Sequence, residues 1–466
     1  MRKEIRLNAF TINSPGHLSP GLWRHPEDQS HRYTDLRYWT DLATTLERGK
    51  IDGLFIADVL GVYDVYGRSP ETALRQAAQV PINDPLQLVS AMAAVTQHLG
   101  FGITASVSFE HPYPFARRLS TADHLTQGRV GWNIVTSYLD SGARNLGQAQ
   151  QLTHDNRYEL ADEYLEVCYK LWEGSWRDDA VQRDAGRGIY VEPSGVRNID
   201  HHGRYFTVPG FHLSEPSPQR TPVLYQAGAS SRGRQFAARH AECVFVAAPT
   251  RHVLRQQVDA IRQEVSRQGR QPDEVTIFNQ LTVIVAHSDE AARAKFEDYQ
   301  RFISHDGALA LMSGWTGIDL SQFAGDQTLE HVESNAIQSA VEAFTAADPE
   351  RQWTVREIAQ YCGIGGDGPV IVGSAQTVAD ALEAWVDETG VDGFNLSAVI
   401  NPGTFADVVD LLVPELQRRG LYKREYRPGT LREKLFGQGP KLASHHHGAT
   451  FRQQAAKPAC PVLAEP

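Results

Sequence analysis

The chain has 466 residues, enough for two or three average domains or for one large α/β barrel with insertions. Its formal charge is −11, from 45 basic and 56 acidic residues that are interspersed, which argues against a nucleic-acid footprint and a polybasic membrane patch. No window approaches the roughly 18 apolar residues of a membrane span, and the four cysteines are too scattered for a disulfide framework or a zinc site. We expect a cytoplasmic protein with a small-molecule partner and no functional metal.

Short apolar runs rich in β-branched residues recur along the chain, and a helical pattern follows each of them, which is typical of βα units. The runs predict strands at residues 5–10, 52–58, 100–108, 129–135, 222–228, 242–248, 276–286 and 392–399. Between them, apolar residues at three- and four-residue spacing predict helices, beginning with one that carries Leu36, Trp39, Leu42, Ala43 and Leu46. Further helices are predicted from about residue 85, at 115–125, at about 154–172 and at about 405–416. Eight such units predict a (β/α)₈ TIM barrel rather than an open doubly wound sheet.

Two stretches are longer than ordinary connections: 174–221 after the fourth strand and 287–390 after the seventh. We expect both to be insertions that roof the barrel of a single domain covering residues 1–436, because long loops in compact domains are usually lids or binding loops. Residues 437–466 lack periodicity, and we expect them to form an irregular tail that is either disordered or an arm onto a neighbouring subunit.

The active site of a (β/α)₈ barrel lies at the carboxyl ends of the strands, so the polar residues there are candidates. They form a predicted collar of Asp58, Thr104, Ser106, Ser108, Trp132, Asn133, Ser137 and Gln226.

The stretch YQAGASSRGRQFAARH, residues 225–240, passes from a strand through small residues into a helix, whose first N–H groups would point at an anion. His154 and Tyr158 stand at the start of the preceding predicted helix and face the same rim. Two helix N-termini that converge favour a phosphate. The alternative is structural: Ser230 or Ser231 is an ordinary N-cap, His154 is solvated and Asp58 caps a loop.

The segment GIGGDG, residues 363–368, matches the dinucleotide motif G-x-G-x-x-G, but a helical pattern precedes it and Pro369 follows at once. The motif needs a strand before it and a helix after it, so we interpret the segment as a glycine-rich lid loop. The chain lacks the hydrolase elbow, the zinc-protease helix, the P-loop and the paired carboxylates of glycosidases. A barrel with a phosphate cradle and few ionisable groups indicates that a cofactor carries the chemistry.

Several blocks of the sequence, among them HPYPFARRLSTADHLTQGRVGWNIVTS, HDNRYELADEYLEVCYKLW, PVLYQAGASSRGRQFAARHAECVF and PELQRRGLYKREYRPGTLREKLFG, resemble the bacterial-luciferase-like flavin monooxygenases. The nearest subgroup is that of nitrilotriacetate monooxygenase, dibenzothiophene sulfone monooxygenase and the pristinamycin IIA synthase large subunit. The resemblance implies a barrel that binds reduced FMN (FMNH2) from a separate NAD(P)H:flavin reductase. It also implies that a flavin peroxide formed with O2 transfers one oxygen atom to a small organic substrate, and that the protein is a homodimer or homotetramer.

The resemblance also implies roles for individual residues. The flavin contacts would be Asp58, Thr104, Asn133, His154, Tyr158, Ser230 and Ser231. The substrate pocket would include Phe55, Phe245 and Trp315, the last at a position where the sulfone-cleaving relatives have a His. His17 is the candidate acid or base, with loop capping or simple binding as its alternative. Two other functions stay open: a deazaflavin-dependent dehydrogenase built on the same barrel, and a flavin-binding protein without catalysis.

Overall fold

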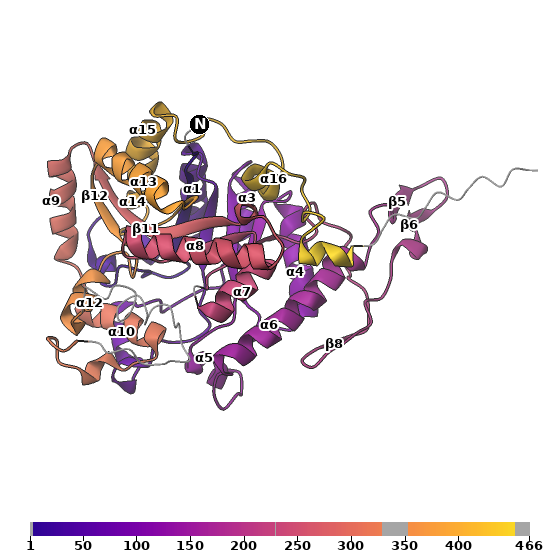
Figure 1. The fold of residues 1–466 in the computed structure, drawn as a ribbon, viewed down its shortest axis with the longest axis horizontal. Helices are drawn as coiled ribbons and strands as arrows, with labels where there is room; N and C mark the ends of the chain where they lie inside the picture. The colour runs from indigo at the N-terminus through magenta and orange to yellow at the C-terminus, as the bar shows by residue number, and fades with distance from the viewer. Residues whose placement is uncertain (1–2, 229, 329–352, 453–466) are drawn as a thin grey trace, which may run out of the picture.

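Eight parallel strands close into a barrel in the computed structural model, which describes residues 3–228, 230–328 and 353–452 (Figure 1). In barrel order they are β1 (Arg6–Ile12), β2 (Gly53–Ala57), β3 (Gly100–Ser106), β4 (Val130–Val135), β9 (Val223–Gln226), β10 (Cys243–Val246), β11 (Thr276–Ala286) and β13 (Gly393–Ser397). The pairing of β13 with β1 closes the circle. Each predicted strand overlaps one of these, and the predicted (β/α)₈ fold is confirmed.

Helices follow the strands and cover the outside of the barrel (Figure 1). They are α1 (Leu36–Arg48), α3 (Leu86–Ala94), α4 (Pro112–Leu125), α6 (His154–Tyr169), α7 (Ser231–His240), α8 (Arg251–Arg267), α13 (Ala375–Thr389), and, after β13, α14 (Gly403–Asp407) with α15 (Val413–Arg418). Helix α1 begins where the Asp35 side chain accepts a hydrogen bond from the N–H of Arg37, which satisfies a free donor of the first turn. Four of the five predicted apolar positions of α1 are buried, whereas Leu36, its first residue, is 53% exposed.

Strand β4 shows how the sequence separates the helix layer from the barrel interior. Successive side chains of a strand point to opposite faces. Trp132 points outward and packs on Phe115 of α4, with ring centroids 4.6 Å apart. Asn133 points inward and donates a hydrogen bond to Thr104 Oγ1 at 3.0 Å. The expectation that Trp132 belongs to the polar collar is therefore wrong, because its neighbour takes the inward position.

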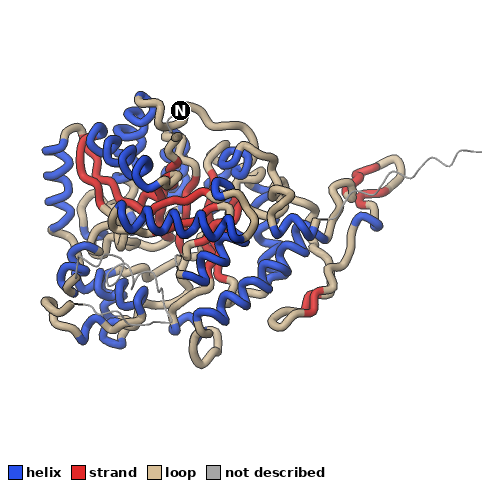
Figure 2. Tube along the Cα trace, viewed as in Figure 1, coloured by secondary structure: helices blue, strands red, loops and turns tan. Residues whose placement is uncertain are grey.

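Residues 174–221 form two small hairpins that project from the barrel, β5 (Val181–Asp184) with β6 (Ile189–Val191) and β7 (His201–His202) with β8 (Thr207–Val208) (Figure 2). The segment follows helix α6 and precedes strand β9, so it lies at the amino-terminal end of the barrel. The expectation that it roofs the mouth is wrong, because a connection from a helix to the next strand runs at the end opposite the active site.

The segment 287–390 holds α9 (Asp289–Gln300), α10 (His305–Thr316), α12 (Val355–Tyr361) and β12 (Val370–Ser374), and residues 329–352 lie outside the described part. Strand β12 pairs with the far half of β11, from Thr282 to Ala286, and extends the sheet beyond the barrel. Helix α10 packs on α12 and on the short helix α2 (Glu71–Gln76) from the loop after β2. These contacts place α10 over the mouth of the barrel. Helix α13, at the end of the segment, packs on α8 like the other barrel helices.

After α15 the chain returns across the barrel through α16 (Leu431–Phe436) and a 3₁₀ turn at His447–Phe451. The turn packs on α6 and α7: His446 Nε2 lies 2.9 Å from the carbonyl oxygen of His240, and Arg452 binds Glu173 at 2.8 Å. The predicted tail continues into 453–466, outside the described residues, and Cys460 lies there.

The other three cysteines, Cys168, Cys243 and Cys362, are buried and free.

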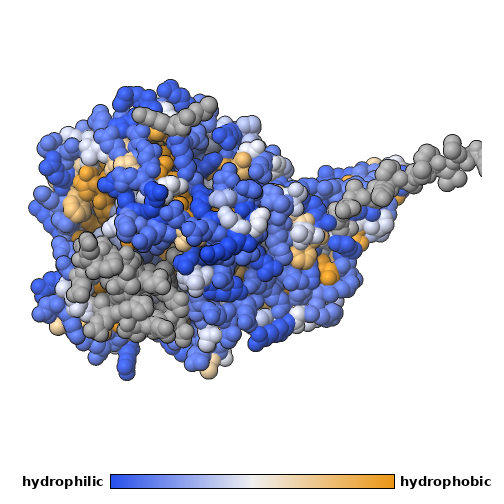
Figure 3. Space-filling view, in the orientation of Figure 1, coloured by the Kyte–Doolittle hydropathy of each residue, from blue (hydrophilic) through white to orange (hydrophobic). Residues whose placement is uncertain are grey.

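Figure 3 shows a mostly hydrophilic face. Within the described ranges, the helices are all too short or too polar to cross a membrane.

Candidate active site

A cavity of about 250 Å³ opens at the carboxyl ends of the barrel strands. Each of the eight strands, or the residue directly after it, contributes to its wall. The predicted site residues that line it are His17, Phe55, Asp58, Thr104, Asn133, Phe245 and Trp315. The chain therefore brings together seven residues that are up to 298 positions apart in sequence, from His17 to Trp315.

The inner wall of the cavity carries unused hydrogen-bond acceptors. The side-chain N–H groups of Asn133 and Gln280 donate to protein acceptors. Asn133 donates to Thr104, and Gln280 donates to the carbonyl oxygen of Gly365 (2.8 Å) and to Ser397 Oγ (2.9 Å). The side-chain oxygens of Asn133, Gln280 and Asn395 are buried and accept no hydrogen bond within the described part of the chain. Because an unsatisfied buried polar atom costs about 1–3 kcal/mol, these three acceptors fit a ligand that presents N–H groups to them.

The N-termini of α6 and α7 meet beside this cavity. Ser230 is the N-cap of α7, and its Oγ accepts a hydrogen bond from the N–H of Gly233 at 3.1 Å. The same Oγ lies 3.3 Å from Nε2 of His154, the first residue of α6. Tyr158, one turn further along α6, receives a hydrogen bond from Gln226 at 3.5 Å. The exposed Ser231 is the first residue of α7, so its backbone N–H belongs to the same cluster of free donors.

Gly228 joins the two parts of the site. It lines the cavity, and a Cβ at this position would come within 2.3 Å of Gln226 Nε2 and 3.0 Å of Tyr158 Oη. Only glycine leaves the backbone accessible here. The bare backbone at Gly228 thus lies between the polar wall of the cavity and the two helix N-termini.

His17 is a neutral imidazole at neutral pH. It is 9% exposed, its ring meets that of Phe10 edge-on at 4.5 Å, and burial lowers its pKa to about 3. Its Nδ1 has no hydrogen-bond partner in the described structure. His17 can therefore accept or donate one hydrogen bond toward the cavity, but it holds no positive charge above about pH 3.

Asp58 follows β2 directly, at the mouth of the barrel, and has a perturbed carboxyl group. Burial, followed by the nearby negative charge of Asp84, raises the pKa of Asp58 to about 6. Close to neutral pH the group is thus able to exist in either protonation state.

Three residues that the sequence did not single out fix Trp315 in the wall. The indole N–H of Trp315 donates to Tyr63 Oη at 3.1 Å, and Tyr63 Oη donates to Gln79 Oε1 at 2.9 Å. Tyr138 Oη lies 2.6 Å from Tyr63 Oη and must be the donor of that pair, since the only proton of Tyr63 is already used. All four side chains line the cavity. Tyr138 follows β4 by three residues, so extending the predicted collar past the strand end would have found it.

The glycine-rich segment 363–368 also reaches the cavity, through Asp367. Helix α12 precedes the segment and strand β12 follows it, the reverse of the order that a dinucleotide site requires. Sequence reasoning therefore rejected the motif correctly, but it missed the carboxyl group within it.

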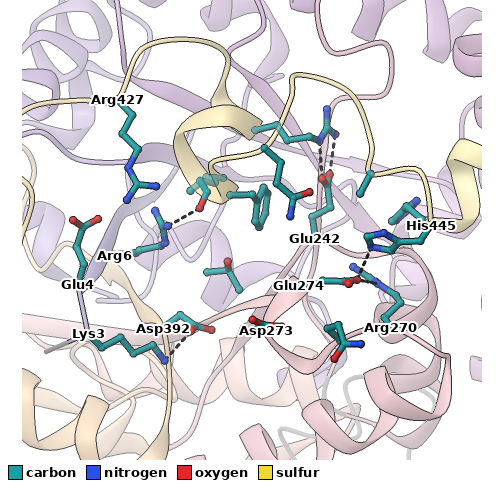
Figure 4. Close-up of a pocket in the computed structure, with 18 residues that line it drawn as sticks. Lys3, Glu4, Arg6, Glu242, Arg270, Asp273, Glu274, Asp392, Arg427 and His445 are labelled. Carbon is teal, nitrogen blue, oxygen red and sulfur yellow. Dashed lines mark hydrogen bonds and ion pairs between the residues drawn. The ribbon is translucent and has the colours of Figure 1, made fainter. Parts of the chain in front are cut away.

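A larger hollow, of about 570 Å³, lies at the opposite end of the barrel, where residues such as Thr276 begin strands (Figure 4). Several of its charged side chains pair with each other: Lys3 with Asp392 at 2.8 Å, and Arg432 with Glu242 at 2.6 Å. We assign it no part in the site, because catalysis in this fold occurs at the carboxyl ends of the strands.

Comparison with known proteins identifies the family. Residues 18–393 match the family model described as luciferase-like monooxygenase, which covers most of the chain. This chain belongs to the luciferase-like monooxygenase family. The predicted family is thereby confirmed, and so is the predicted subgroup, because a dibenzothiophene-sulfone monooxygenase, a nitrilotriacetate monooxygenase component and a pristinamycin IIA synthase subunit match at least 90% of the chain.

Two members of the luciferase-like family are similar over almost the whole length. The dimethyl-sulfide monooxygenase of Hyphomicrobium sulfonivorans is 53% identical over 97% of this chain and 94% of its own, and its crystal structure superposes with a TM-score of 0.90. The long-chain alkane monooxygenase of Geobacillus thermodenitrificans is 51% identical over 97% of this chain and 99% of its own, also with a TM-score of 0.90.

A third similar structure is a riboflavin lyase with modified FMN and riboflavin, which is 35% identical over 97% of this chain and 100% of its own, with a TM-score of 0.91. The predicted monooxygenase activity is confirmed at the level of the family, and the comparisons support a flavin cofactor.

Proposed function

We propose that this protein is the oxygenase component of a two-component system. It takes reduced FMN from a separate NAD(P)H:flavin reductase, uses O2 as co-substrate and transfers one oxygen atom to a small organic substrate. The observation that carries the proposal is the continuity between the three unused acceptors of the cavity and the converging N-termini of α6 and α7.

The residues present fit a flavin mononucleotide. Ser230, Ser231, His154 and Tyr158 would bind the phosphate with hydroxyl, imidazole and helix N–H donors. Thr104, Asn133 and Asp58 would contact the remainder of the cofactor from the strand ends. The unused oxygens of Asn133, Gln280 and Asn395 match the N–H groups at the polar edge of a reduced flavin ring.

Bound reduced FMN would supply the two electrons that activate O2. The protein's own contribution is positioning and the exclusion of water. Phe55 and Phe245 pack against each other in the cavity wall, with ring centroids 4.4 Å apart and ring planes tilted by 53°, and Trp315 closes the cavity from α10. His17 would contact substrate as a neutral hydrogen-bonding group, because its low pKa leaves no proton to donate as a cationic acid.

We also propose that the protein is cytoplasmic and forms a homodimer or homotetramer. The free, buried thiols Cys168, Cys243 and Cys362 support a reducing compartment.

Oxygen uptake tests the function. The protein is mixed with FMN, NADH and an unrelated flavin reductase, and candidate substrates are added one at a time. We expect substrate-dependent uptake of O2 with formation of an oxygenated product. Tight binding of a deazaflavin with no O2 uptake would identify a dehydrogenase instead, and flavin binding without any turnover would identify a binding protein.

A further inference from the structure

The charged side chains that the described residues contribute to the cavity wall are acidic. Among the described residues that line it are two carboxyl groups, those of Asp58 and Asp367, and neither a lysine nor an arginine. His17 is the one histidine that the described part of the chain contributes to the wall, and it is neutral at physiological pH. An anionic substrate would therefore meet two carboxyl groups and no compensating cation from the described lining.

The backbone of the loop holds Asp367 at the cavity. Gly365 and Gly366 adopt left-handed φ angles of +81° and +68°, which glycine alone adopts freely. A Cβ on Gly366 would come within 3.1 Å of Leu18, and one on Gly368 would overlap Gln280 Oε1 at 1.8 Å. The backbone on both sides of Asp367 is thus packed against the wall, and Asp367 between them lines the cavity.

The Asp367 carboxyl group has no cationic or side-chain partner within the described ranges, and its single hydrogen bond is to its own backbone. Burial raises its pKa to about 6. Asp367 is half-buried. A carboxylate that is largely removed from water and has no partner is unfavourable in the folded protein and is usually explained by a ligand or a catalytic role.

Aromatic side chains make up much of the remaining wall. They are Phe10, Phe55, Tyr63, Tyr138, Phe245 and Trp315. Aromatic faces attract cations through the ring quadrupole, most strongly where water is excluded. Together with an unpaired carboxylate, they make a site that favours a small organic cation over a neutral or anionic molecule of equal size.

We propose that the substrate of this enzyme is a small organic cation, such as a protonated alkylamine, and that Asp367 binds its positive group. This inference rests on the proposed function and adds the substrate class and the residue that selects it. Asp58 stays with the cofactor.

Calorimetric titration of the FMN-loaded protein at pH 8 tests the proposal with three four-carbon probes: butylammonium, 1-butanol and butyrate. We expect butylammonium to bind at least tenfold more tightly than either of the others. Asp367→Asn removes the charge and almost preserves the shape, so it should weaken butylammonium at least tenfold and leave 1-butanol unchanged. Asp387→Asn, which removes an exposed charge on α13 that has no ion-pair partner among the described residues, is the matched control and should change nothing.

Three results would overturn the proposal. They are butyrate or 1-butanol binding as tightly as butylammonium, the absence of measurable butylammonium binding, and equal loss of all three probes in Asp367→Asn. Loss of the cation preference in Asp58→Asn but not in Asp367→Asn would also overturn the assignment to Asp367. Each variant's melting temperature and FMN affinity are measured in parallel. Failure of the wild type to bind FMN would refute the proposed function, whereas normal FMN binding without cation preference refutes only this inference.

Discussion

Replacing Ser230 by Asp separates the two roles of this residue. Ser230 caps α7 through the 3.1 Å hydrogen bond from Gly233, and an Asp side chain caps a helix at least as well. A carboxylate at the N-terminus also complements the helix dipole, by about 0.3–1 kcal/mol. We therefore expect the free energy of unfolding without FMN to be unchanged or slightly raised.

The same substitution should weaken the binding of FMN. With Ser230 Oγ 3.3 Å from His154 Nε2, an Asp carboxylate at this position would stand beside the proposed phosphate. Two unit charges about 4 Å apart repel by about 4 kcal/mol at an effective dielectric constant of about 20. Local rearrangement relieves part of this, so we expect the affinity for reduced FMN to fall at least tenfold, which corresponds to about 1.4 kcal/mol. Riboflavin, which lacks the phosphate, should lose much less.

Anaerobic titration of both reduced flavins into wild type and variant gives the comparison, and urea unfolding gives the stability. Thr250→Asp is the matched control, because Thr250 caps α8 in the same way, with a hydrogen bond of 3.3 Å from Val253. It should leave both flavin affinities unchanged. Equal losses for FMN and riboflavin in Ser230→Asp, or no loss for either, would refute the phosphate site.

Three further predictions follow from the same geometry. The purified protein alone should not oxidise NADH, whereas NADH should be consumed once a separate flavin reductase is added. Steady NADH oxidation without reductase, followed at 340 nm, would contradict this. Trp315→His, which alters the hydrogen bond to Tyr63, should change which substrates are accepted, by about 1–3 kcal/mol of discrimination, more than it changes FMN affinity; an equal loss of FMN binding would contradict the placement of Trp315 at the substrate. Asp367→Asn should raise the free energy of unfolding at pH 8 by about 1–2 kcal/mol. The pKa of Asp367 is about 6 in the folded protein against 3.8 in the unfolded chain. Because the folded pKa is raised, the wild type loses stability as the pH rises through 6, and the variant does not. The gain should disappear below about pH 4 in pH-dependent unfolding experiments, and a gain independent of pH would show that the charge is not its cause.

The barrel was predictable because its strands have a recognisable sequence pattern. Parallel strands buried on both faces form continuous apolar runs, and all eight were found to within a few residues, as for β11 at Thr276–Ala286. The rule that the active site of this fold lies at the carboxyl ends of the strands likewise predicted that Asp58, Thr104 and Asn133 line one cavity. A rule of this kind works where position along the chain determines position in space.

Other features depend on contacts that the sequence does not encode locally. Gln280 and its neighbour Asn279 both interrupt an apolar strand, but only Gln280 lines the cavity, and the direction of each side chain is set by register. The 174–221 segment was assigned to the wrong end of the barrel because its length was taken as the sign of a lid, although the helix predicted before it makes it a helix-to-strand connection. Asp367 was missed because its position depends on the packing of Gly366 and Gly368 against Leu18 and Gln280.

A crystal structure of the protein with FMN would be the most direct measurement of the proposed site. We predict the phosphate within hydrogen-bond distance of Ser230 and His154, and the polar edge of the flavin ring against the unused oxygens of Asn133, Gln280 and Asn395. An FMN phosphate away from the N-termini of α6 and α7, or a flavin ring outside the cavity at the strand ends, would contradict the proposed function of this chain.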